Sequence, residues 1–185
     1  MRSTAEASAL VRAFDTSLEE EKSRELILAL LELTDAPFWR DQFHPGHITC
    51  TAVVLHPDGR RVLLMHHHRH QRWLLPGGHV EEDDVTLSDA ARREAIEETA
   101  VRIAEPSAVN LVGMDVHGIP ARKREPFHLH HDLIFAFNAD SEEFALTEEA
   151  PEVAWCGVGN AEFERYQLPA SITRAVERAV RNKSR

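Results

Sequence analysis

Residues 77–101 read GGHVEEDDVTLSDAARREAIEETAV, a glycine pair followed by an acidic loop and a helical pattern. The pattern predicts a helix over residues 86–99, with Asp84 or Thr86 as its N-cap. The glycine pair lets the backbone turn tightly and approach a ligand closely. The stretch therefore predicts a loop-to-helix unit that is suited to binding a ligand.

Three glutamates fall on one face of the predicted helix. Glu94, Glu97 and Glu98 are spaced i, i+3 and i+4, so their side chains project within one turn. Carboxylates this close repel one another, and a hard divalent cation such as Mg²⁺ or Mn²⁺ would relieve the repulsion. Arg93 lies four residues before Glu97 and is placed to orient that carboxylate. The alternative is a solvated acidic face, but the arginine and the preceding Leu75-Pro76-Gly77-Gly78 favour a metal site.

The segment from Gly78 to Val101 resembles the Nudix box, G-x5-E-x7-R-E-U-x-E-E-x-G-U, in which U is a bulky apolar residue. The spacing from Gly78 to Arg93 is one residue longer than the consensus, which places the consensus glutamate near Asp83 or Asp84. Ala100 replaces the late glycine, a change that affects the end of the helix and not a carboxylate. Neither departure removes a predicted metal ligand.

The resemblance implies a metal-dependent hydrolase that splits a nucleoside diphosphate linked to another moiety, or a similar small diphosphate. Water would attack one phosphorus atom, and Mg²⁺, with Mn²⁺ as the alternative, would be the cofactor. By similarity to the family, Glu97 and Glu98 are expected to bind the metal. Glu94 is expected to be a further ligand or the base that activates water, and Arg93 completes the catalytic set.

The remaining site residues follow from the same resemblance. Gly78 is expected to contribute to metal binding and, together with Gly77, to contact the substrate. A further acidic ligand or base often comes from a later loop in this family. The candidates there are Glu148, Glu149 and Glu152, which all stay open, with Glu149 taken as the representative metal ligand.

A second unusual segment, residues 117–132, is rich in histidine. On a strand His128, His130 and Asp132 share one face, because side chains alternate with a period of two. This face, together with His117, is predicted to contact the substrate or to hold a second metal. The alternative is a polar sheet edge whose histidines are satisfied by hydrogen bonds, and both interpretations stay open.

Arg72 and Trp73 lie just before the box, after the histidine-rich run of residues 66–70. Both are predicted to contact the substrate, with Trp73 stacking on a base. The alternative for Trp73 is packing in the core or in a loop.

The rest of the chain predicts an α/β (α+β) fold, a Nudix-like α/β/α sandwich with a mixed sheet. Helices are expected over residues 5–34 and 171–181, and strands over residues 48–55, 61–65, 108–116, 127–137 and 153–158. The resemblance predicts three parts: a helical N-terminal extension (1–45), a Nudix domain (46–160) and a C-terminal helix packed on the domain (161–185).

The composition of the chain limits which binding partners and which cellular location we expect. The formal net charge of −10 argues against binding a nucleic-acid polymer and suits a small phosphorylated substrate, such as a nucleotide derivative, that is bound through a metal. No apolar run reaches the roughly 20 residues that span a bilayer, and the N-terminus lacks the apolar core of a signal peptide. A cytoplasmic protein with Cys50 and Cys156 reduced is expected, with one disulfide as the alternative. The N-terminal helices are candidates to cover a homodimer interface or to cap the site, and both interpretations stay open.

Two other functions compete with hydrolysis. A Nudix-like module that senses a nucleotide without cleaving it would not need the three glutamates, and no helix-turn-helix is evident. An isomerase of the isopentenyl-diphosphate type would need a catalytic cysteine in its own motif, which Cys50 lacks.

Overall fold

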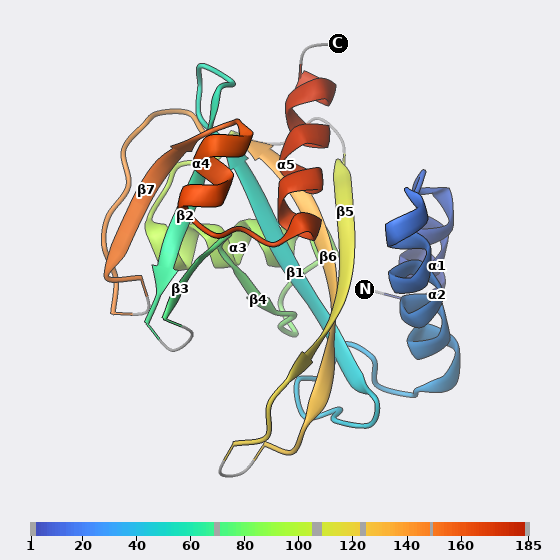
Figure 1. Cartoon of the computed structure of the whole chain (residues 1–185). Coiled ribbons are helices and arrows are strands. Elements are labelled where there is room, and N and C mark those ends of the chain that lie inside the picture. Colours follow the sequence, from blue (N-terminus) through green and yellow to red (C-terminus); the bar gives the residue numbers. More distant parts are fainter. Residues whose placement is uncertain (1–2, 69–70, 105–108, 123–124, 149, 184–185) are drawn as a thin grey trace.

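The computed structural model describes residues 3–68, 71–104, 109–122, 125–148 and 150–183 (Figure 1). Its elements in chain order are α1 (Thr4–Ala13), α2 (Leu18–Leu33), β1 (Gly46–Leu55), β2 (Arg61–His67), β3 (Arg72–Leu74), β4 (Gly77–His79), α3 (Leu87–Thr99), β5 (Leu111–Ile119), β6 (His128–Asn138), β7 (Glu152–Gly157), α4 (Asn160–Arg165) and α5 (Ala170–Lys183).

Strand β1 is the centre of a mixed sheet that has seven strands within the described residues. The sheet order is β3-β2-β1-β6-β5, while β4 also pairs with β1 and β7 also pairs with β2. The β1–β6 pairing is parallel over the whole of β1, and the other pairings are antiparallel. Because β6 and β4 both pair with the first half of β1, side chains from three strands meet there.

Helices cover both faces of the sheet (Figure 1). Helices α1, α2 and α3 share one apolar core with Ile48 and Ala52 of β1, whereas α4 and α5 share a second core with Val53 and Leu55. Alternation along β1 sends consecutive side chains to opposite cores. The predicted α/β/α arrangement with a mixed sheet is confirmed.

Several local details differ from the sequence-based expectation. The N-terminal helical segment forms two helices. Ser17 is the N-cap of the second, and its backbone N–H donates a hydrogen bond to the Glu20 carboxylate at 2.9 Å. The strand expected over residues 108–116 runs from Leu111 to Ile119, and residue 108 lies outside the described residues. Strands β3 and β4 and helix α4 were not predicted, since they are too short to show a periodic pattern.

Two further observations concern the cysteines and membrane spans. Cys50 and Cys156 are free thiols and are buried in different cores. No helix within the described ranges is long and apolar enough to cross a membrane.

Helix α3 begins and ends at defined caps. Of the two candidate N-caps, Thr86 has the role, because its hydroxyl accepts from the Asp89 N–H at 3.1 Å and Asp89 accepts from the Thr86 N–H at 3.0 Å. Ala100 ends the helix in the left-handed region, with φ 52° and ψ 18°. A side chain is strained in that conformation, which explains why glycine is favoured there.

We expect Ala100→Gly to stabilise the protein by up to about 1 kcal/mol, because it removes the Cβ strain of the left-handed conformation. Urea unfolding measures the effect. The matched control is Ala9→Gly on an exposed position of α1, where glycine should cost about 0.5–1 kcal/mol. Equal losses of unfolding free energy at both positions would contradict the strain that we assign to Ala100.

An ion pair joins α2 to α5 beside the edge strand β5. Arg178 donates two hydrogen bonds to the carboxylate of Glu20, at 2.9 and 2.8 Å, and one to the Val112 carbonyl at 2.6 Å. Glu20 is only 2% exposed. Burial would raise the pKa of Glu20, but hydrogen bonds from Arg178 and Ser17 outweigh burial and hold this pKa below its ordinary value. This ion pair, in which Glu20 is buried, therefore links α2 to α5.

Replacing Arg178→Met should destabilise the protein by about 3–5 kcal/mol, because it leaves the Glu20 charge buried without its partner. Chemical unfolding at neutral pH measures the loss, and Arg181→Met at an exposed position is the control. The double variant Glu20→Gln/Arg178→Met should recover part of the stability. A single variant no less stable than the control would rule out this account.

Candidate active site

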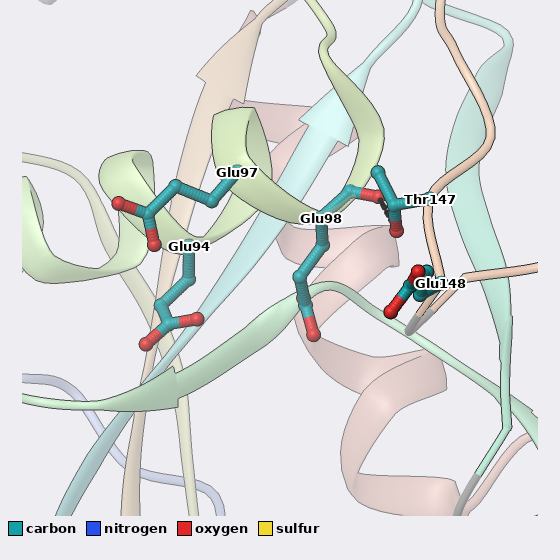
Figure 2. Close-up of a pocket in the computed structure, with 5 residues that line it drawn as sticks. All are labelled: Glu94, Glu97, Glu98, Thr147 and Glu148. Carbon is teal, nitrogen blue, oxygen red and sulfur yellow. Dashed lines mark hydrogen bonds between the residues drawn. The ribbon is translucent and has the colours of Figure 1, made fainter.

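Helix α3 presents Glu94, Glu97 and Glu98 on one side (Figure 2). They line an open pocket of about 250 Å³ together with Thr147 and Glu148, which come from the loop before β7. Glu98 is buried, and its carboxylate accepts a hydrogen bond from the Gly77 N–H at 2.9 Å. The spacing of the glutamates on the helix therefore places three carboxylates in one pocket.

Arg93 organises the acidic side chains around this pocket. One terminal nitrogen donates to Glu94 (3.1 Å) and to Glu97 (3.0 Å). The other two nitrogens donate to Asp84, at 3.0 and 3.1 Å, and the last remaining N–H donates to the His79 carbonyl at 2.8 Å. All five guanidinium donors are thus used. Lysine has three donors and no planar fork, so it would not replace this arginine.

Asp84 stands where the family consensus places its first glutamate. It is buried and also accepts the Glu81 N–H at 2.8 Å, so it holds the acidic loop and Arg93 together. Of the two positions that the sequence allowed, Asp83 and Asp84, only the latter makes this contact with Arg93 among the described residues. The longer loop therefore keeps an acid at the required place.

The glycine pair on β4 permits close approach on both sides of the strand. A Cβ atom on Gly78 would lie 2.7 Å from a carboxylate oxygen of Glu94, and one on Gly77 would lie 2.7 Å from the Cys50 carbonyl oxygen. Side chains in place of these hydrogens would push β4 away from α3 or from β1. Gly77 donates its N–H to Glu98 and Gly78 lies against the Glu94 carboxylate, so both glycines adjoin predicted metal ligands.

The electrostatics of Glu94 favour a cation in this pocket. Burial raises the pKa of Glu94; the charge and the hydrogen bond of Arg93 oppose this effect, and the charges of Glu97 and Glu81 add to it. The ionised carboxylate is therefore under-compensated by the protein alone. A set of carboxylate oxygens with this deficit fits a hard divalent cation such as Mg²⁺.

We expect Glu94→Gln to raise the melting temperature of the metal-free protein at neutral pH. A raised pKa means that ionisation costs stability above that pKa, and the cost is absent below the pKa of the unfolded chain, where both states are protonated. The advantage of the variant should therefore vanish in acid. Added Mg²⁺ should stabilise the native protein more than the variant.

Differential scanning fluorimetry with and without Mg²⁺ provides the measurement. Glu82→Gln, at an exposed position of the acidic loop, is the matched control and should behave like the native protein. An equal Mg²⁺ response in Glu94→Gln and the native protein would show that Glu94 does not contact the ion.

The predicted histidine face is assembled by strands β5 and β6. His117 lies opposite His130 in the strand register, and His128 and His130 lie with ring centres 5.2 Å apart. Asp132 is buried on the same face and accepts the Thr49 hydroxyl at 3.0 Å. The structure thus brings these four predicted residues together.

Arg72 and Trp73 lie on β3 and are not among the described residues that line the carboxylate pocket. The Trp73 ring packs edge-on against Tyr166, 5.0 Å between ring centres, and against His66 at 5.6 Å. This contact corresponds to the packing alternative for Trp73. A hydrogen bond to Asp115 raises the pKa of His117, and the charge of Arg72 opposes this rise.

The later-loop candidates are separated by the structure. Glu148 lines the carboxylate pocket, and Glu152 begins β7 opposite His66 of β2. Glu149, the representative metal ligand of the sequence analysis, lies outside the described residues.

Sequence reasoning missed two histidines that belong to the same face. His47 on β1 and His79 on β4 lie with ring centres 4.9 and 5.4 Å from that of His130. The signal for His47 was present, because His47, Thr49 and Thr51 alternate with apolar residues and so share one polar face of the strand. His79 showed no pattern, since only pairing with β1 brings it to this face.

A family model identifies the kind of domain that carries this fold and this carboxylate pocket. The model of the NUDIX domain matches residues 46–176, more than half of the chain. The chain therefore belongs to the Nudix domain family, whose members are usually pyrophosphohydrolases. No curated protein matches the sequence.

Solved structures share the fold at low sequence identity. The MutT protein from Methanosarcina mazei is 21% identical, with a TM-score of 0.52, over 75% of this chain and 95% of that chain. An Ap4A hydrolase from C. elegans is 15% identical, with a TM-score of 0.52, over 74% and 97%. The NUDIX domain of NrtR from Shewanella oneidensis, solved in complex with ADP-ribose, is 20% identical, with a TM-score of 0.54, over 85% and 97%. Identities this low establish the fold alone.

Proposed function

We propose that this protein is a Mg²⁺-dependent hydrolase that cleaves the pyrophosphate linkage of a small nucleoside diphosphate joined to another moiety. The observation that carries the proposal is the convergence of Glu94, Glu97 and Glu98 on one open pocket. The nucleotide derivatives named for the Ap4A hydrolase and for the NrtR domain support this substrate class. Mn²⁺ is the alternative cofactor.

The three glutamates are the residues that would hold the metal. Bound there, Mg²⁺ would neutralise phosphate oxygens and lower the pKa of the attacking water. Glu98 is oriented by the Gly77 N–H, while Arg93 fixes one oxygen each of Glu94 and Glu97. These contacts hold the carboxylates in place before substrate arrives, which lowers the reorganisation that catalysis requires.

Glu94 is also a candidate for the base. Its raised pKa brings the carboxylate closer to the working pH, which improves proton transfer from water. Glu148, on the other side of the pocket, is the second candidate. In the reaction the water oxygen bonds to one phosphorus, its proton goes to the base, and the bridging oxygen leaves with the other phosphate.

Substrate contacts beyond the phosphates are proposed for the histidine face. His117, His128, His130 and Asp132 lie together next to β4, whose Gly78 faces Glu94. Successive side chains of a strand point to opposite sides, so His79 projects away from Glu94 and toward the histidines. A substrate that extends past β4 would therefore meet polar side chains.

Phosphate release, coupled to a phosphatase and measured across a panel of nucleoside diphosphate derivatives with Mg²⁺ or Mn²⁺, tests the proposal. We expect turnover of at least one compound at mildly alkaline pH. Glu98→Gln should lower kcat by about 100-fold or more, because it removes a carboxylate at the reacting centre. Glu82→Gln should leave kcat unchanged.

The competing functions predict different outcomes. If no compound turns over but one binds in calorimetry with Mg²⁺ present, the domain is a nucleotide sensor and the hydrolase proposal fails. The structure argues against the isomerase alternative. Cys50 lies on β1 and is completely buried in the core that β1 shares with α1, α2 and α3, so its thiol is not accessible to a substrate.

A further inference from the structure

Three strands bring three imidazole rings to one point outside the carboxylate pocket. His47 of β1, His79 of β4 and His130 of β6 each offer a ring nitrogen, and these atoms all lie within 4.8 Å of one another. The ring centres are 5.0 Å apart for His47 and His79, 4.9 Å for His47 and His130, and 5.4 Å for His79 and His130. We refer to these three residues as the histidine triad.

The strand register explains why the triad forms. His47 and His130 are direct neighbours in the parallel β1–β6 pair. His79 is placed across β1 by the short antiparallel pairing of β4, in which it lies opposite Thr49. The three residues therefore come from segments far apart in sequence but are held by backbone hydrogen bonds on both sides of β1.

His47 has a buried ring nitrogen that makes no hydrogen bond to any of the described residues. Its side chain is only 1% exposed, and its Nδ1–H donates to the Gln42 carbonyl at 3.1 Å. That bond assigns the proton to Nδ1, so Nε2 carries the lone pair. Within the described residues Nε2 has no hydrogen-bond partner. An unpaired buried acceptor is costly, and a histidine whose Nδ1–H is held by a carbonyl is the usual arrangement of a metal ligand.

Neighbouring histidines show the same pattern of protonation. The Nδ1–H of His128 donates to the Pro126 carbonyl at 2.8 Å, and His117 Nδ1 bonds to the Asp115 carboxylate at 3.0 Å. Both rings lie beside His130, at 5.2 and 5.7 Å between centres. The Nδ1 atoms of both rings therefore bond to oxygen atoms outside the triad.

The spacing agrees with tetrahedral coordination. With a metal–nitrogen distance of about 2.0–2.1 Å, imidazole rings on one Zn²⁺ have centres roughly 5 Å apart, close to the observed values. Nitrogen atoms bound to one such ion lie about 3.4 Å apart. Side-chain rotations that move the ring nitrogens by about an ångström would bring them to this distance. His79 and His130 are half-buried, so an ion can enter.

We propose that the histidine triad binds a divalent transition-metal ion, with Zn²⁺ as the preferred ion, at a site distinct from the carboxylate pocket. Imidazole ligands favour borderline-soft ions such as Zn²⁺, whereas the three glutamates favour Mg²⁺, so donor chemistry sorts the two metals. Three protein ligands leave one position open for water or for a group of the substrate.

The proposed ion would be linked to the carboxylate pocket through β4. The carbonyl of His79 accepts a hydrogen bond from Arg93, and the preceding Gly78 lies against the Glu94 carboxylate. An ion held by the His79 ring would tie β4 to β1 and β6. The site does not depend on the proposed hydrolase activity, because its ligands are separate from the three glutamates.

Titration of the chelator-treated full chain with Co²⁺, in excess Mg²⁺, tests this proposal. Co²⁺ replaces Zn²⁺ in nitrogen sites and reports coordination by its visible absorption. We expect one Co²⁺ per chain with a tetrahedral spectrum, displaced by Zn²⁺. His79→Gln and His130→Gln should each weaken binding at least about tenfold.

Two controls separate this site from the others. His68→Gln, an exposed histidine outside the triad, should bind Co²⁺ like the native protein. Glu98→Gln should also keep Co²⁺ binding while it loses Mg²⁺-dependent hydrolysis, so failure of one proposal does not imply failure of the other. Thermal unfolding of each variant confirms that it is folded.

Native-like Co²⁺ binding in folded His79→Gln and His130→Gln would overturn the proposal. So would a native protein that binds no Co²⁺ while Mg²⁺ is present in excess. Retained binding in His68→Gln and Glu98→Gln, together with loss in both triad variants, supports it.

Discussion

The guanidinium of Arg93 is the contact on which the arrangement of the site depends. Its five N–H donors reach the acidic loop through Asp84, strand β4 through the His79 carbonyl, and helix α3 itself through Glu94 and Glu97. Without this cation the acidic side chains would repel one another, and Asp84 would lose two of its hydrogen bonds. A planar group with fixed donor directions ties β4 to α3 more rigidly than a flexible ammonium group would.

Strand β4, which Arg93 holds in place, contributes to both the carboxylate pocket and the histidine triad. It is only three residues long, yet the Gly77 N–H binds Glu98, Gly78 lies against Glu94 and the His79 ring joins the histidine triad. The carboxylate pocket offers hard oxygen donors and the triad offers neutral nitrogen donors. The same short strand therefore lies between a site suited to Mg²⁺ and a site suited to Zn²⁺.

Much of the carboxylate pocket could be predicted from sequence, because its three predicted metal ligands lie on one helix. The i, i+3, i+4 spacing of Glu94, Glu97 and Glu98 determines a shared face as soon as the helix forms, and the box-like pattern indicated the family. The orientation of Arg93 toward Glu97 follows from the same periodicity. The sequence left Asp83 and Asp84 as alternatives for the consensus glutamate, since a loop of unusual length does not reveal which acid turns inward.

The sequence alone determined the elements whose signals are local: the α3 helix, the alternating strands, the acidic face and the face shared by His128, His130 and Asp132. Only the tertiary structure decided what meets across strands. His47 and His79 join His130 because β1 pairs with β6 in parallel and with β4 in antiparallel register, and Arg178 finds Glu20 beside an edge strand. Such contacts depend on register and packing between distant segments, and neither is encoded in the periodicity of any one segment.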